Sequence, residues 1–370
     1  MLEDQFLLDP TVVFLNHGSF GACPAPVFEA YQGFQRELER RPVEFLALER
    51  RFPELLEVAR ARLARYVGAS PGNLAFVPNA SSALNAVARS LELGPGDEVL
   101  LGDAEYGGLE RLWAYVAERS GATLVRRPFS ELEPGPRTRV LFCSHIEWTS
   151  GRVNDIAEVC RRARAAEVLS IVDGAHAPGQ IELDLEAIGA DVYAGNCHKW
   201  LCAPKGSAFI YARPEVQPLI DPPVVSWDWL DGAAFHERHR WQGTRDPSAY
   251  LAVPAAIDFQ AEHDWPQVRR RCHSLLAAHD FGLEPLTDEF VQMRGFRIDD
   301  PDPPELKRRL YDEHRIEVPV FETRQGWTLR VSVQAYNDEA DLQALAAALA
   351  SLRQRSRRAG SSSSPDRVTR

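Results

Sequence analysis

The sequence predicts an α/β protein whose large domain is built on a mainly parallel sheet. Short apolar, β-branched runs alternate with amphipathic stretches from about residue 72 to 212. Such alternation is typical of parallel strands covered by helices. After residue 255 the alternation stops, and helical segments surround one strand-like run, WTLRVSVQ. This change indicates a second, smaller α+β domain towards the C-terminus.

Six apolar runs are the predicted strands of the large sheet. In chain order they are NLAFVP, EVLLGD, RVLFCSH, LSIVDGA, DVYAGN and GSAFIYA. Each run is short and is rich in β-branched or aromatic residues, which favours a strand. Ligands of parallel sheets bind at the carboxyl ends of the strands. We therefore expect a functional site among the residues that follow these runs.

The domain boundaries follow from the same patterns. We expect a large domain over residues 21–255, preceded by a segment over 1–20, and a small domain over 256–353. The small domain should end in the helical stretch DEADLQALAAALASL. The remaining residues, 354–370, are rich in Ser and Arg with little to bury, so we predict a disordered tail.

Composition restricts the possible partners. The chain has 42 basic and 53 acidic residues, a formal net charge of −11, and no basic stripe, which argues against nucleic acid or an anionic membrane. Six cysteines without a C-x-x-C pair argue against a zinc ribbon or a disulfide framework. The N-terminus lacks the basic residues of a secretory signal, and no apolar run could span a bilayer. We expect a cytoplasmic protein with a small-molecule ligand.

Two polar residues follow neighbouring predicted strands. Asp173 ends LSIVD, and Lys199 comes shortly after DVYAGN. In a pyridoxal-phosphate site a carboxylate pairs with the pyridinium nitrogen, while a lysine amine forms an imine at the other end of the ring. Taken singly, a turn cap and a surface lysine would be the more common interpretation. A metal site formed by Cys197, His198 and Cys202 is a weak alternative because a fourth ligand is missing, so no metal is expected.

Three further segments carry polar or aromatic groups next to predicted strands or helices. Asn79 is a good helix cap, so the free amides of the next three residues could bind a phosphate; these residues are Ala80, Ser81 and Ser82. Tyr106 follows EVLLGD and precedes two glycines, where a ring could stack on a flat heterocycle. Gly243 and Thr244 lie in a polar turn that could also contact phosphate. Helix capping and side-chain packing, without any ligand, are the alternative interpretations of these residues.

Together these segments resemble the class V aminotransferase family, and within it the isopenicillin N epimerase-like group. The similarity is carried by FLNHGSFGACPAPV, by DGAHAPGQ paired with GNCHKWL, and by GTRDPSAYLAVPAA. The resemblance implies the PLP-dependent transferase fold type I, pyridoxal 5'-phosphate (PLP) as cofactor and an amino acid as substrate. It also implies a homodimer with shared active sites, and a segment over residues 1–20 that borders the site.

The resemblance assigns roles around the cofactor ring. It implies that Lys199 is the Schiff-base lysine and Asp173 the partner of the pyridine nitrogen. His176 is implied to lie near the phenolic oxygen, and Tyr106 to stack on the ring. These four residues are the expected catalytic groups.

Other implied roles concern the phosphate and the substrate. His198 and Ser81 match phosphate contacts, and Thr244 matches a phosphate contact from the neighbouring subunit. Arg330 in LRVS matches the arginine that holds the substrate carboxylate. A loop bordering the substrate is matched by Asn16, His17 and Gly18.

Two departures from cysteine desulfurases narrow the expected chemistry. The segment FETRQGWTLRVS contains no nucleophilic cysteine, so sulfur transfer through a persulfide is not expected. Glu147 and Trp148 stand where desulfurases place an asparagine near the phenolic oxygen. An amino-acid epimerase, racemase or aminotransferase is the leading hypothesis, a C–S lyase acting on a cysteine conjugate is the alternative, and a non-catalytic binding domain is the remote one.

Overall fold

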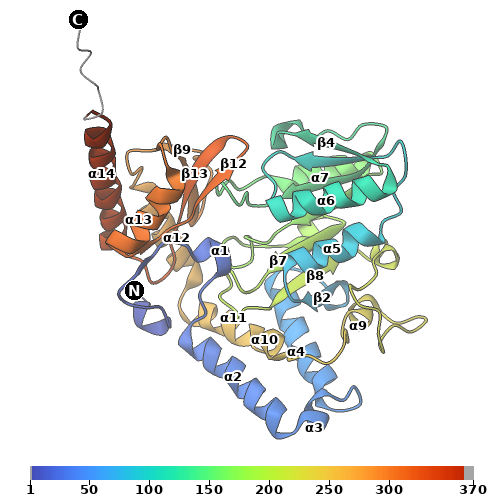
Figure 1. Ribbon diagram of the computed structural model, residues 1–370. Helices are drawn as coiled ribbons and strands as arrows, with labels where there is room; N and C mark the ends of the chain where they lie inside the picture. The colour runs from blue at the N-terminus through green and yellow to red at the C-terminus, as the bar shows by residue number, and fades with distance from the viewer. Residues whose placement is uncertain (1, 362–370) are drawn as a thin grey trace, which may run out of the picture.

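A computed structural model describes residues 2–361, with side chains as far as residue 353, and its main feature is a seven-stranded sheet (Figure 1). The strand order is β2-β8-β7-β6-β5-β3-β4. The bounds are β2 (Leu74–Val77), β3 (Glu98–Gly102), β4 (Thr123–Arg127), β5 (Thr138–Ser144), β6 (Leu169–Asp173), β7 (Val192–Asn196) and β8 (Ala208–Ala212).

The sheet is parallel except around β8. β4, β3, β5, β6 and β7 pair in parallel, whereas β8 runs antiparallel to both β7 and β2. All six predicted strands are present, so the predicted fold class is confirmed. β4 was not predicted. In the structure its residues, TLVRR, are exposed at both ends of the strand and half-buried between them.

Helices cover both faces of this sheet. Alternate strand residues belong to two different hydrophobic cores, as expected for side chains that point to opposite faces. One core contains residues of α2 (Ala25–Arg40), α3 (Pro42–Leu46), α4 (Arg51–Tyr66), α7 (Ile156–Ala165), α8 (Leu185–Ile188), α10 (Ser248–Leu251) and α11 (Val253–Glu262). The other contains residues of α5 (Ala80–Ser90), α6 (Gly107–Ser120) and α9 (Phe235–Arg238).

A second, four-stranded antiparallel sheet has its own core with three helices (Figure 1). Its strands, in sheet order, are β12 (Val320–Thr323), β13 (Gly326–Ser332), β10 (Met293–Arg297) and β9 (Glu284–Pro285). The helices are α12 (Trp265–Ala277), α13 (Pro303–His314) and α14 (Glu339–Ser361). The strand predicted around WTLRVSVQ is therefore β13, and DEADLQALAAALASL, apart from its first residue, lies in α14.

The N-terminal segment is tied to this second sheet. β1 (Val13–Phe14) pairs in parallel with β11 (Ile316–Glu317). The Ser332 amide then donates to Leu15 O at 2.9 Å. The single turn α1 (His17–Phe20) follows directly and lies between the two sheets (Figure 1). Short 3-10 turns complete the chain at η1 (Glu3–Gln5), η2 (Pro71–Asn73), η3 (Phe129–Glu131) and η4 (Gln217–Leu219).

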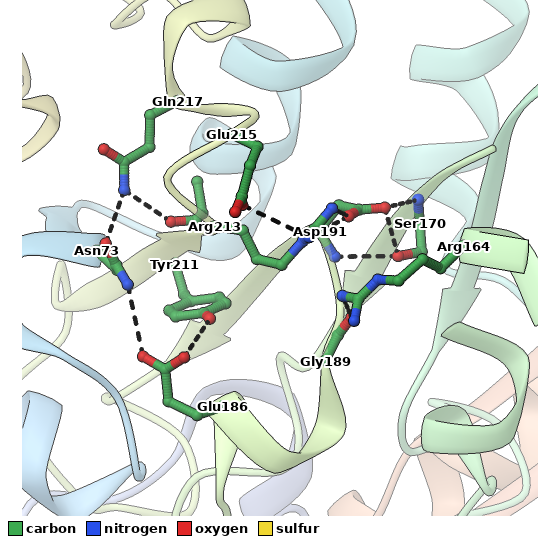
Figure 2. A network of polar contacts seen from close by, with 11 residues as sticks. Asn73, Arg164, Ser170, Glu186, Gly189, Asp191, Tyr211, Arg213, Glu215 and Gln217 are labelled. Atoms are coloured by element: carbon green, nitrogen blue, oxygen red, sulfur yellow. Dashed lines mark hydrogen bonds and ion pairs between the residues drawn. The ribbon is translucent and has the colours of Figure 1, made fainter. Parts of the chain in front are cut away.

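A polar network fixes the amino ends of the central strands (Figure 2). Asp191, immediately before β7, accepts hydrogen bonds from the Ser170 amide at 2.7 Å, the Ser170 hydroxyl at 2.8 Å and Arg213 Nε at 2.7 Å. Asp191 is buried, so its charge depends on these donors. The network therefore holds β6, β7 and the end of β8 together at the edge opposite to Asp173.

The proposed domain boundaries stay a prediction. The helix α14 carries the backbone of residues 354–361, and the rest of the predicted tail, 362–370, lies outside the described residues. Within residues 2–361, no helix combines the length and the apolar character needed to cross a membrane.

Candidate functional site

The carboxyl ends of β5, β6 and β7 bring the predicted site residues to one edge of the sheet. Asp173 is the last residue of β6, where it pairs with Ser144 of β5 and Ala194 of β7. Its Oδ1 accepts a hydrogen bond from the Ala175 amide at 2.9 Å. Burial raises the pKa of Asp173, and the neighbouring Lys199 counteracts this. A cation placed against this carboxyl group would keep it ionised.

Lys199 follows β7 in a turn, and its amine lies 3.0 Å from His176 Nε2. Trp200 Nε1 donates to His176 Nδ1 at 3.2 Å. Because the indole nitrogen can only donate, the proton of the neutral imidazole lies on Nε2, which then donates to the amine. Such a bond requires an unprotonated amine. Burial and the nearby Arg330 lower the pKa of Lys199 to about 8, which also favours the unprotonated amine.

Arg330 of β13 is buried without an acidic partner in the described part of the chain. It is 3% exposed. Its Nη1 donates to Trp148 O at 2.6 Å and its Nη2 to Ser19 Oγ at 2.9 Å. Its Nε is buried and has no hydrogen-bond partner there. A buried guanidinium that is satisfied only by neutral groups is suited to a carboxylate ligand.

The N-terminal residues occupy two different positions. A Cβ placed on Gly18 would lie 3.5 Å from Arg330 Nη2, so this residue borders the arginine. Asn16 is also buried, and its amide donates to Glu317 Oε1 at 2.9 Å. His17 is fully buried, with Nε2 3.0 Å from the carbonyl oxygen of Lys199.

That His17 borders a substrate stays a prediction, and within one chain both of its ring nitrogens have partners in the core. Since a carbonyl only accepts, His17 Nε2 must carry the proton, and Nδ1 accepts from Tyr336 OH at 3.0 Å. Burial lowers the pKa of His17 to about 3, so the ring stays neutral. His17 thus supports the backbone of Lys199 from within the core.

The helix α5 begins at Ala80, as predicted, and Asn79 is its cap. Asn79 Oδ1 accepts from the Ser82 amide at 2.8 Å. The Ala80 amide donates to Asn196 Oδ1 at 2.9 Å. The prediction of three free amides is therefore wrong for Ala80 and Ser82, because side chains already satisfy them. The Ser81 amide and the two serine hydroxyls are the groups left for an anion.

A buried glutamate that the sequence did not point to lies beside Tyr106. Glu105 accepts from the Ser144 amide at 3.1 Å and from the Ser144 hydroxyl at 2.6 Å. Burial raises the pKa of Glu105 to about 8. A Cβ on Gly102 would lie 2.2 Å from Glu105 Oε1, so the glycine makes room for this carboxyl group. A loop glutamate is usually solvated, so no sequence signal marked it.

Tyr106 is half-exposed and lies edge-on to Trp148, with 5.7 Å between ring centroids. Trp148 Nε1 donates to Glu105 O at 3.0 Å. A pocket of about 660 Å³ opens beside these residues, with Glu105, Glu147 and Trp148 on its wall. Arg330 is not among the residues that line this pocket, but it donates to the carbonyl of Trp148, which is.

The other predicted phosphate contacts lie in different places. His198 Nδ1 is 2.9 Å from Ser207 O, so it donates there and only Nε2 is left for a ligand. Thr244 lies in an exposed turn before α10. The hydrogen bonds and ring contacts within the described part of one chain do not connect Thr244 with Lys199, Asp173 or Arg330.

Comparison with known proteins gives the family. The model of the family described as aminotransferase class-V matches residues 13–291. The isopenicillin N epimerase of Amycolatopsis lactamdurans is 39% identical over 95% of this chain and 97% of its own length. A probable chloroplastic L-cysteine desulfhydrase of Arabidopsis thaliana is 27% identical over 90% of this chain and 81% of its own.

Solved structures support the same fold. A mutant of C-DES with glycine covalently linked to its PLP cofactor superimposes with a TM-score of 0.82 at 23% identity, covering 94% of this chain and 98% of the other. The cysteine desulfurase CsdA of Escherichia coli gives a TM-score of 0.79 at 23% identity over 95% and 98% of the two chains. The chain belongs to the class V aminotransferase family of PLP-dependent enzymes.

Proposed function

We propose that this enzyme acts on the α-carbon of an amino acid, as an epimerase or racemase or as an aminotransferase. The observation that carries the proposal is the placement of a buried amine beside a buried, unpaired guanidinium. Burial, and then the charge of Arg330, lower the pKa of Lys199 to about 8. An α-amino acid offers a carboxylate to the guanidinium and an α-proton to the amine.

The residues fit PLP. Asp173 would hold the pyridine nitrogen, Lys199 the aldehyde carbon, and His176 would lie near the phenolic oxygen. Ser81, Ser82 and His198 would hold the phosphate, with Thr244 contributed by a second subunit. When bound, PLP supplies an electrophilic carbon and a ring that accepts electrons from the substrate. The buried carboxyl group of Asp173, whose pKa burial raises, is suited to a cationic ring nitrogen, and the orphaned Nε of Arg330 is suited to the substrate carboxylate.

Different side chains would then have different roles towards the substrate. Arg330 would orient the carboxylate, and Lys199 Nζ would take the proton from Cα. Epimerisation needs an acid on the opposite face, and Tyr106, whose hydroxyl has no partner among the described residues, is the candidate.

A C–S lyase is the second candidate. Two similar proteins are described as a probable and a putative L-cysteine desulfhydrase, at 27% and 29% identity over 90% and 93% of this chain. The proton removal from Cα would be the same, and the sulfur substituent on Cβ would then leave. A lyase needs no acid opposite to Lys199, so the role of Tyr106 separates the two candidates.

A homodimer with shared active sites is part of the proposal. The loop between β8 and α9 exposes large apolar side chains; Trp227 is 80% exposed and Leu230 66% exposed. Such a patch is typical of a protein interface. Thr244 follows the same region of the chain and has no site contact within one chain. We also propose a cytoplasmic location, which the six free cysteines support.

The test is a panel of L- and D-amino acids and cysteine conjugates, with products separated by chiral chromatography. Stereoinversion would support an epimerase, and transfer of the amino group to an oxo acid would support an aminotransferase. Release of an oxo acid with a thiol would favour the lyase. Absence of any product with cofactor-loaded protein would contradict the proposal, and Tyr106→Phe would selectively slow epimerisation.

A further inference from the structure

A pocket between α4, α9 and α10 collects buried nitrogen atoms that have no partner. Its volume is about 280 Å³. Within the described residues, three nitrogens of its lining side chains form no hydrogen bond: Arg60 Nη1, His236 Nδ1 and His239 Nε2. Buried polar atoms in folded proteins almost always have a partner. Three such atoms in the lining of one pocket make it a candidate site for a polar ligand.

Two arginines give this pocket its preference for an anion. Arg60 is 5% exposed, and its Nε and Nη2 are already bound to Glu57. Its Nη1 is the donor that remains. Arg245 lies over the Tyr250 ring at 4.8 Å and forms no ion pair within the described part of the chain. Two guanidinium groups are thus available to one ligand.

The remaining charged groups around the pocket are already engaged or solvated. Glu54 is exposed. Arg238 of the same helix α9 donates to Gln217 O at 2.9 Å. The engaged groups are Glu57 with Arg60, Glu237 with the Ala234 amide, and Arg240 with Asp228. Among these acids only Glu54 has no partner within the described residues, and its side chain is exposed to solvent.

His239 restricts the ligand further. Its Nδ1 lies 2.9 Å from Phe235 O, and because a carbonyl only accepts, Nδ1 carries the proton. The buried Nε2 therefore presents a lone pair while the ring is neutral. Burial lowers the pKa of His239 to about 4 and also lowers the pKa of His236. At neutral pH the ligand must donate a hydrogen to Nε2.

We propose that this pocket binds inorganic phosphate as hydrogenphosphate, with its charged oxygens on Arg60 and Arg245 and its hydroxyl on His239 Nε2. Hydrogenphosphate is an anion that keeps one O–H at neutral pH, whereas sulfate has none. Sulfate would leave the His239 lone pair unsatisfied. The pocket should therefore discriminate between two ions of similar size and charge.

The test is calorimetric titration of the cofactor-loaded enzyme, in which the cofactor's own phosphate occupies its site. At pH 7.5 we expect phosphate to bind about tenfold more tightly than sulfate, because one hydrogen bond to a buried group is lost. His239→Leu should remove this preference. Arg60→Met should abolish binding of both ions, while Arg65→Met, an exposed arginine on the same helix, should bind like the wild type.

The pH dependence gives an independent check that needs no variant. Sulfate affinity should rise as the pH falls, because a protonated His239 Nε2 becomes a donor. Equal binding of phosphate and sulfate at pH 7.5, or phosphate binding retained in Arg60→Met, would overturn the proposal. Absence of phosphate binding to the wild type would also overturn it. If Arg60→Met then weakens self-association, a carboxylate of a second copy fills the pocket instead.

Discussion

At the scale of single residues, the site depends on groups that are buried in unusual charge states. Lys199 and Arg330 are two basic groups in one buried region, and the described chain places only Asp173 near them as an acid. This arrangement is costly without a ligand, because buried charges need partners. It becomes favourable when a carboxylate binds Arg330 and a cationic ring binds Asp173.

Arg330 should control substrate affinity more than turnover. For Arg330→Met we expect KM for the amino-acid substrate to rise by about tenfold to a hundredfold, since a charge-assisted hydrogen bond is worth roughly 1.5–3 kcal/mol. Steady-state kinetics measures this. Arg297→Met, an exposed position on the adjacent strand β10, is the control and should keep the KM of the wild type. An unchanged KM in Arg330→Met would exclude the carboxylate role.

The lowered pKa of Lys199 predicts a pH dependence of cofactor binding. Only the neutral amine attacks an aldehyde, so reconstitution of the apoenzyme with PLP should accelerate as the pH rises through about 8. Above that pH the rate should level off. Stopped-flow absorbance against pH would check it. A rate that keeps rising towards pH 10.5, the ordinary lysine value, would mean that burial does not depress this pKa.

At the scale of elements, the sequence allowed prediction of six of the seven strands of the large sheet and of the start of α5, because these have local signals. The carboxyl ends of β6 and β7 then placed Asp173 and Lys199 without any structural information. The engagement of the Ala80 amide by Asn196 could not be predicted, because these residues meet only through the pairing of distant strands. The burial of His17 likewise depends on Tyr336, far along the chain.

His17 couples the N-terminal segment to the Lys199 turn, so its removal should loosen both. For His17→Ala we expect a loss of about 1–3 kcal/mol in the free energy of unfolding, because Tyr336 OH and the Lys199 carbonyl lose their partner. The apparent affinity for PLP should fall as well. His17→Gln should recover part of both losses, because it can still donate to that carbonyl. Denaturant titration and PLP binding measure the two effects, and an unchanged PLP affinity in His17→Ala would contradict the coupling.

At the scale of the whole molecule, the residues that stabilise the large sheet and the residues of the candidate site lie at opposite edges of that sheet. The Asp191 network joins the amino ends of β6 and β7, whereas the site residues follow their carboxyl ends (Figure 2). Asp191→Ala should therefore lower the free energy of unfolding by about 3 kcal/mol while leaving kcat unchanged under native conditions. Glu215→Ala is the matched control, since this exposed partner of Arg213 should contribute under about 1 kcal/mol. Equal losses in the two variants would contradict the importance of burial.

The central claim is that Lys199 carries the cofactor, and the chain allows a direct test because it has only three lysines, Lys199, Lys205 and Lys307. The measurement is borohydride reduction of the PLP-loaded protein followed by proteolysis and mass spectrometry of the lysine-containing peptides. We predict a visible absorbance band that disappears on reduction, and a pyridoxyl-phosphate mass on the Lys199 peptide alone. Labelling of Lys205 or Lys307 instead, or no reducible band after saturation with PLP, would contradict the claim.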